Sequence, residues 1–220
     1  MNFSQPPFSL IVLYKRKLLV FDLFSGTGSA TQAFHDAGHT IIKIEIDEYF
    51  KAHERDILAL NAAYLIKKYG QPDFIWASPP CTSFSVASIG HHWNLDRTPK
   101  TDEAFASLEL VKFTLRLIKD LNPQAWLMEN PRGMLRKQAI MQGLERREIT
   151  YCAYGEKRMK PTDLWGSVPN WDARKSCKNG DKCHEAAPRG ARTGTQGLKG
   201  ARIRSMIPYQ LGLELLDAFK

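Results

Sequence analysis

The feature that most constrains the fold of this chain is a regular alternation of short apolar runs with segments of helical periodicity. Apolar, β-branched and aromatic runs predict buried strands over 17–24, 40–46, 74–77, 125–128 and 148–153. Helical patterns predict helices over 29–37, 58–69, 102–121, 133–144 and 208–219. Strands that alternate with helices favour a doubly wound, mostly parallel α/β sheet.

The composition changes after Trp171. Residues 172–200 are rich in Gly, Lys and Arg and poor in large aliphatic side chains, so they cannot build a core of their own. We expect a catalytic domain over 1–171, a small basic recognition segment over 172–200, and a C-terminal helix within 201–220 that packs back on the domain. A solvated polar loop is the alternative for the basic segment. The basic residues that fit phosphate contact are Arg174, Lys175, Lys178, Lys182, Arg189, Arg192, Lys199, Arg202 and Arg204.

The charge and the cysteine content narrow the class of protein. A formal net charge of +8 favours an anionic partner, with nucleic acid ahead of an acidic membrane. No apolar run approaches the roughly 20 residues that span a bilayer. A basic cluster follows the apolar patch over 8–13, which is the reverse of a signal peptide. Four cysteines do not form a dense disulfide framework, so we expect a reduced, cytoplasmic protein.

A glycine-containing turn follows the first predicted strand, in Asp22-Leu-Phe-Ser-Gly-Thr-Gly28. Glycine lets a backbone approach a ligand closely. Thr31 stands where a dinucleotide fingerprint has its third glycine, which favours a smaller nucleoside cofactor over a pyrophosphate. Glu45 ends the next strand, where an acid commonly meets ribose hydroxyls. The alternative is a structural turn of any α/β protein.

Cys81 lies in a loop directly after the predicted strand over 74–77, behind two prolines. A thiol needs positive charge or nearby amides to become a reactive thiolate, and the turn after Cys81 could supply the amides. Glu129 ends the strand over 125–128, and adjacent strand ends in such a sheet line one crevice. Burial there would keep its carboxyl protonated and able to donate to a ring nitrogen. A buried small hydrophobe and a solvated helix cap are the alternatives for the two residues taken singly.

Together these residues resemble the DNA cytosine-5 methyltransferase family, most of all its short bacteriophage-type members. The resemblance covers residues 18–160, and its most specific part is Ser78-Pro-Pro-Cys-Thr-Ser-Phe-Ser85. It implies a Rossmann-like fold that binds S-adenosylmethionine, with Glu45 on the ribose hydroxyls and Asp56 on the adenine amino group. Ile46 replaces the aromatic residue that often stacks on adenine. The implied cofactor contacts are Asp22, Phe24, Gly26, Gly28, Glu45, Ile46, Asp56 and Pro79.

The resemblance also implies a mechanism on double-stranded DNA. Cys81 would attack carbon 6 of a flipped cytosine, Glu129 would hold N3 and the exocyclic amine, and Arg158 would contact O2. Residues 156–160 replace the family's Gln-x-Arg-x-Arg, and the recognition region is shorter than usual. The chain would act as a monomer in a bacterial or phage-infected cell. The alternatives are an RNA cytosine-5 methyltransferase and an inactive DNA-binding module of the same fold.

Two further groups of residues have open interpretations. Cys177 and Cys183-His184, with Cys152 upstream, offer zinc ligands, but their spacing is irregular and free thiols are the alternative. His91-His92-Trp93 follows the Cys81 loop. We interpret these three residues as a mobile flap over the flipped base, with an ordinary loop around a buried tryptophan as the alternative.

Overall fold

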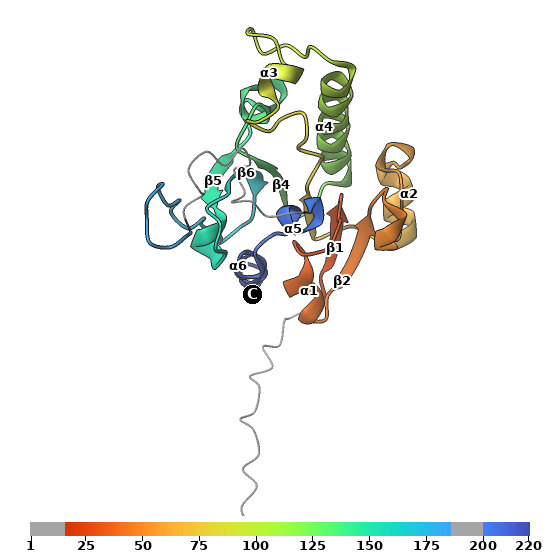
Figure 1. Cartoon of the computed structure of the whole chain (residues 1–220). Helices are drawn as coiled ribbons and strands as arrows, with labels where there is room; N and C mark the ends of the chain where they lie inside the picture. The colour runs from red at the N-terminus through yellow and green to blue at the C-terminus, as the bar shows by residue number, and fades with distance from the viewer. Residues whose placement is uncertain (1–15, 186–199) are drawn as a thin grey trace, which may run out of the picture.

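The computed structural model describes residues 16–185 and 200–220. Within these residues the strands form one sheet in the order β2-β1-β3-β4-β6-β5 (Figure 1). The first four strands in this order are parallel, whereas β6 runs antiparallel to β4, and β5 antiparallel to β6. The strands are β1 Leu19–Leu23, β2 Thr40–Ile44, β3 Phe74–Ala77, β4 Ala125–Pro131, β5 Arg146–Thr150 and β6 Pro161–Ser167.

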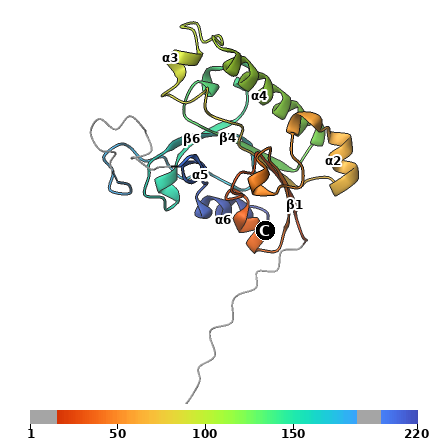
Figure 2. The ribbon, with the colours of Figure 1, turned by 45° about the vertical axis from the view of Figure 1, so that its right-hand side comes forward.

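Helices cover both faces of this sheet (Figure 2). Along β1, Val20 packs into the cluster that includes α1 and α6, and Phe21 into the cluster that includes α2 and α4. Strands buried on both faces read as continuous apolar runs, which is why these strands were predictable. The helices are α1 Gln32–Asp36, α2 Ala62–Tyr69, α3 Ile89–His92, α4 Asp102–Leu121, α5 Ala201–Ser205 and α6 Tyr209–Asp217. The doubly wound α/β prediction is confirmed.

Helix α4 shows how local chemistry sets the boundaries of an element. Thr101 caps its N-terminus, with its hydroxyl oxygen accepting the Ala104 N–H at 3.3 Å. Asp102 and Glu103 place negative charge in the first turn, where the helix dipole favours it. Asn122 ends the helix in the left-handed conformation, with φ of 44°. The predicted range of 102–121 is therefore confirmed.

The chain between β4 and β6 departs from the prediction. The helix predicted over 133–144 is wrong, because this segment forms only two short 3-10 turns, Leu135–Lys137 and Ala139–Met141. A backbone N–H near the start of this segment bonds instead to the Cys81 loop. The Met134 N–H donates to the Phe84 carbonyl at 2.7 Å. The strand predicted over 148–153 lies earlier, at Arg146–Thr150, and continues as a 3-10 turn, Tyr151–Tyr154. Strand β6 was not predicted.

The C-terminal residues return to the first helix. The Ile207 N–H donates to the Ser29 hydroxyl at 2.9 Å, and the Tyr209 hydroxyl donates to Asp36 at 3.0 Å. Gly212 of α6 lies so near Ala33 of α1 that an added Cβ would sit 3.2 Å from the alanine methyl. Helix α6 therefore covers α1. Within the described residues, no helix has the length and apolar character needed to cross a bilayer.

Candidate active site

The turn after β1 places the first part of the site. Phe24, Gly26 and Gly28 all have left-handed backbone, with φ of 61°, 46° and 73°. Of the three residues, only Phe24 adopts this conformation at a cost in free energy, since glycine alone adopts it freely. The Gly26 N–H donates to the Glu45 carboxylate at 2.8 Å, which joins the turn to the end of β2.

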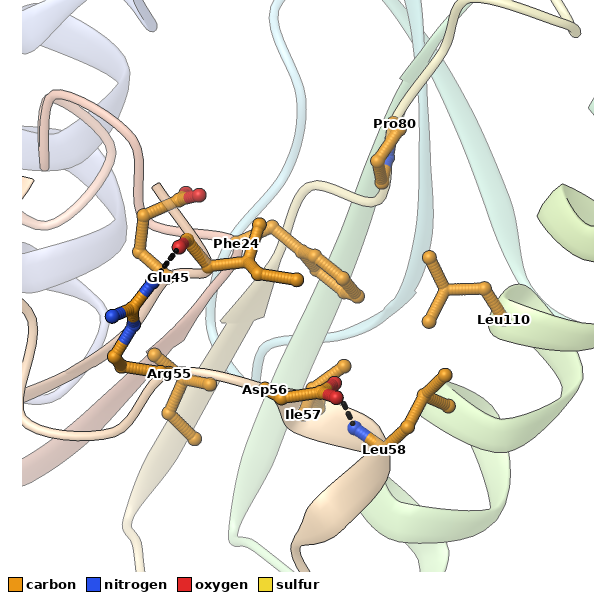
Figure 3. Close-up of a pocket in the computed structure, with 10 residues that line it drawn as sticks. Phe24, Glu45, Arg55, Asp56, Ile57, Leu58, Pro80 and Leu110 are labelled. Carbon is orange, nitrogen blue, oxygen red and sulfur yellow. Dashed lines mark hydrogen bonds between the residues drawn. The ribbon is translucent and has the colours of Figure 1, made fainter. Parts of the chain in front are cut away.

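A pocket of about 240 Å³ opens beside this turn (Figure 3). It lies at the carboxyl ends of the parallel strands, where α/β proteins bind their ligands. Of the eight predicted cofactor contacts, Phe24, Glu45, Ile46 and Asp56 line it, and Asp22, Gly26, Gly28 and Pro79 do not. The complete lining is Phe24, Ile44, Glu45, Ile46, Arg55, Asp56, Ile57, Leu58, Pro80 and Leu110.

The lining combines two carboxylates with apolar walls. The Asp56 carboxylate accepts the Leu58 N–H at 3.0 Å, and the Arg55 guanidinium donates to the Ile46 carbonyl at 3.0 Å. Sequence reasoning missed the apolar wall. Leu58 follows Asp56 closely and could have been found from it, but Leu110 comes from α4 and has no local signal.

Asp22, one of the predicted cofactor contacts, does not line the pocket. Its carboxylate is buried under the turn and accepts the Thr31 hydroxyl at 2.7 Å. Burial raises the pKa of Asp22 to about 7, although the Thr31 hydrogen bond opposes this shift. Asp22 therefore fixes the turn from below and does not face the pocket.

Cys81 lies half-buried in the loop after β3. The predicted turn amides exist, but the Phe84 and Ser85 N–H groups donate to the Cys81 carbonyl, at 3.1 and 3.0 Å, and not to the sulfur. Burial raises the pKa of the Cys81 thiol, and the nearby Glu129 charge adds to the rise, whereas Lys160 lowers it. The raised pKa disfavours the thiolate, and the positive charge of Lys160 near the sulfur favours it.

Glu129 lies on β4 and is buried. Its Oε1 accepts the Tyr151 hydroxyl at 2.9 Å, and the Lys160 ammonium lies 3.8 Å away. Burial raises the pKa of Glu129, and Lys160 opposes that rise. Sequence reasoning missed Lys160, which also donates to the Tyr151 hydroxyl and to the Arg204 carbonyl, each at 3.2 Å.

One hydrogen bond joins the Cys81 loop to the Glu129 strand. The side-chain amide of Asn130 is fully buried and donates to the Pro79 carbonyl at 3.0 Å. Strands β3 and β4 are paired in parallel just before this point, with Ala77 opposite Met128. The nucleophile candidate and the acid candidate are thus held together by adjacent backbone.

Arg158, the third predicted catalytic residue, is also buried. Its Nε and Nη2 donate to one Glu156 oxygen, at 3.1 and 3.0 Å. Its Nη1 is buried and has no hydrogen-bond partner in the described part of the chain. The guanidinium charge also acts on Tyr151, the hydroxyl partner of Glu129. Arg158 thus offers one buried donor group that no described residue uses.

The mobile flap predicted at 91–93 is wrong. His92 and Trp93 are buried, and the Trp93 indole N–H donates to the Ser83 carbonyl at 2.7 Å. The Trp93 ring also packs on Phe84, with ring centroids 5.6 Å apart. Through these contacts Trp93 packs against the Cys81 loop. The segment therefore supports the loop and does not cover a base.

The basic residues after Trp171 that were predicted to contact phosphate have different surroundings. Arg174 pairs with Glu214 at 2.5 Å, and Arg202 stacks on Tyr49, 3.7 Å from the ring centre. These two cations therefore make contacts within the chain that compete with the predicted phosphate contact. Lys175, Lys178 and Lys182 are exposed, whereas Arg189, Arg192 and Lys199 lie outside the described residues.

Comparison with known proteins identifies the family. Residues 18–145 match the family described as C-5 cytosine-specific DNA methylase. The chain belongs to this family. The matched range includes the turn after β1, the Cys81 loop and Glu129.

Individual relatives agree with this assignment. The DNA methylase is 28% identical to the Frog virus 3 (isolate Goorha) protein named "Probable DNA (cytosine-5)-methyltransferase", over 90% of this chain and 98% of that protein. It is 26% identical to the type II methyltransferase M1.HphI of Haemophilus parahaemolyticus, over 64% of this chain but only 39% of that enzyme. The structure of the Entamoeba histolytica methyltransferase EhMeth has a similar fold, with a TM-score of 0.52 and 13% identity over 74% of this chain and 58% of that one.

Replacing Gly133 with alanine should impair the DNA methylase without removing any chemical group. A Cβ at this position would lie far inside van der Waals distance of the Phe84 carbonyl oxygen, so the Cys81 loop must shift. A displacement of this size can cost about 100-fold in rate. The measurement is methyl transfer to DNA with purified Gly133→Ala protein.

Gly90→Ala is the matched control, since a Cβ there meets nothing within 4 Å. It should keep normal activity. Equal activity of Gly133→Ala and Gly90→Ala would show that the position of the Cys81 loop does not depend on this contact.

Proposed function

We propose that this DNA methylase transfers a methyl group from S-adenosylmethionine to carbon 5 of cytosine in DNA, through covalent attack by Cys81. The observation that carries the proposal is the Asn130–Pro79 hydrogen bond of 3.0 Å. It holds a thiol and a buried carboxyl at the ends of two adjacent parallel strands, next to the pocket that Pro80 helps to line.

The pocket suits a nucleoside cofactor. Glu45 would accept from ribose hydroxyls, and Asp56 from the adenine amino group, while Phe24, Ile57 and Leu110 would contact the adenine ring. S-adenosylmethionine bound there supplies a methyl group on a positively charged sulfur, which an electron-rich carbon can attack.

The reaction begins when a cytosine leaves the duplex and enters the crevice. The Cys81 thiolate forms a bond to carbon 6, and the electrons of the ring double bond move towards carbon 5 and N3. Protonated Glu129 donates to N3 and stabilises this charge, which agrees with the burial that raises its pKa. After methylation, carbon 5 loses its proton, and the Cys81–carbon bond breaks to restore the ring double bond.

Two cations assist this chemistry. The Lys160 ammonium lowers the pKa of the Cys81 thiol and so increases the fraction of thiolate. Arg158 would donate from its unpartnered Nη1 to cytosine O2.

The net charge of +8 supports double-stranded DNA as the substrate. We infer that the protein acts as a monomer in the cytoplasm of a bacterial or phage-infected cell.

The test is covalent trapping on a modified base. Carbon 5 of 5-fluorocytosine carries no proton that can be lost, so after methylation the Cys81–carbon bond cannot break. We expect DNA that contains 5-fluorocytosine, incubated with the protein and S-adenosylmethionine, to form an adduct that survives a denaturing gel. A protein that traps only the equivalent RNA would be an RNA methyltransferase. A protein that traps neither but binds S-adenosylmethionine would be a binding module.

A further inference from the structure

Three cysteines and a histidine meet outside the active site. Cys152 lies in the 3-10 turn after β5, whereas Cys177, Cys183 and His184 come from the segment that follows β6. Their ligand atoms, one from each residue, all lie within 4.8 Å of one another. All three cysteines are free.

Three of four separations between these ligand atoms match those of a tetrahedral zinc site. Zinc–sulfur bonds of about 2.3 Å and a zinc–nitrogen bond of about 2.0 Å give tetrahedral edges of about 3.7 Å between sulfurs and about 3.5 Å between sulfur and nitrogen. The Cys152 and Cys183 sulfurs are 3.7 Å apart. The His184 Nδ1 lies 3.5 Å from the Cys183 sulfur and 3.6 Å from the Cys177 sulfur. The Cys152–Cys177 edge is shorter, at 2.9 Å, and must open by less than about 1 Å for zinc to fit.

The backbone around the cluster holds these side chains in position. The Cys177 N–H donates to the hydroxyl of Thr150, two residues before Cys152, at 3.0 Å. The loop then turns at Asp181, whose carboxylate accepts the Lys178 N–H at 2.7 Å. The turn brings both adjacent residues Cys183 and His184 towards Cys152, which their irregular spacing in the sequence did not indicate.

We propose that Cys152, Cys177, Cys183 and His184 bind one structural zinc ion. Three sulfurs and one imidazole nitrogen suit zinc and exclude magnesium or calcium, which bind oxygen ligands. Four protein ligands leave no coordination position for a substrate, so the ion is structural. Binding displaces three thiol protons. The proposal does not depend on the proposed function.

The ion would fasten the basic segment to the catalytic domain. The loop that follows β6 lies beside β5 in Figure 1, and the Ser176 hydroxyl donates to the Glu148 carbonyl of β5 at 2.6 Å. At its far end, the Glu185 N–H donates to the Lys157 carbonyl at 2.9 Å, directly before Arg158. A segment with few large aliphatic residues needs another source of folding energy, and zinc binding supplies one.

The test is the metal content of the full chain, purified under reducing conditions and incubated with Zn²⁺. Elemental mass spectrometry should find about one zinc per chain. Cys183→Ser changes an exposed residue, so the protein should still fold but lose the zinc. Cys177→Ser should lose it as well. The matched control is Cys81→Ser, which removes the one cysteine outside the cluster and should keep the zinc.

Cobalt gives a readout that is independent of activity. Co²⁺ in this site should show the intense visible absorption of a tetrahedral thiolate complex, and Cys183→Ser should abolish it. Absence of zinc from the folded protein would overturn the proposal, and so would zinc that persists in both serine variants. A Cys152–Cys177 disulfide found by peptide mass spectrometry under the same reducing conditions would also overturn it.

Discussion

Replacing Cys81 with serine should reduce methyl transfer to DNA by on the order of 10⁴-fold or more, because a nucleophile that forms a covalent intermediate has no substitute in the site. A hydroxyl is far less acidic than a thiol. The surroundings of Cys81 make this worse, since burial already disfavours the charged form of the thiol. The measurement is transfer of a radioactive methyl group to cytosine-containing duplex DNA.

Cofactor binding provides the internal control for Cys81→Ser. Cys81 does not line the pocket beside the β1 turn, so the variant should bind S-adenosylmethionine with unchanged affinity. It should also form no adduct with 5-fluorocytosine DNA. Methyl transfer by Cys81→Ser at the rate of the unaltered protein would exclude covalent catalysis by this residue.

Replacing Asp163 with alanine should lower the free energy of unfolding by about 3 kcal/mol, because removing one member of a buried ion pair leaves its partners uncompensated. Asp163 is fully buried on β6 and accepts from the Arg136 guanidinium at 2.5 and 2.7 Å and from Arg146 at 2.7 Å. Both arginines are partly exposed, and Arg136 keeps its ion pair with Glu148 at 2.6 Å, so the loss should fall at the lower end of the usual range. The measurement is denaturant unfolding at neutral pH.

The matched control for Asp163→Ala is Glu109→Ala on α4. Glu109 forms an exposed ion pair with Lys112 at 2.6 Å, and such a pair contributes less than about 1 kcal/mol. Similar effects of the two substitutions would show that burial adds nothing to the Asp163 pairs.

Asp163→Ala should also lower the pKa of Glu129, since the Asp163 charge raises it.

The parallel half of the sheet could be predicted because its residues carry local signals. β1 and β3 are mostly apolar and buried on both faces, and α4 has a threonine cap and a left-handed asparagine at its ends. Strand β6 could not be predicted in the same way. Its central Asp163 looks like a surface residue, and only arginines from other segments make its burial possible.

The candidate site also divides into residues with a local sequence signal and residues whose role depends on distant contacts. Cys81 and Glu129 could be proposed from the sequence because Cys81 follows an apolar strand and Glu129 ends an apolar run, each within a specific motif. Lys160 was missed because its importance arises from a contact across 31 positions, to Glu129 at 3.8 Å. The prediction of a helix over 133–144 was wrong because of another contact between distant residues. The Met134 N–H donates to the Phe84 carbonyl in the Cys81 loop.

The return of α6 onto α1 affects how the chain folds during synthesis. Phe34 of α1 is fully buried, and Leu211 and Leu215 of α6 lie in the same apolar cluster. Until those leucines leave the ribosome, the side of α1 that they cover stays open to water and to other chains. The apolar side of α1 is therefore covered only when α6 is available, and the stages of folding before that are the ones most exposed to aggregation.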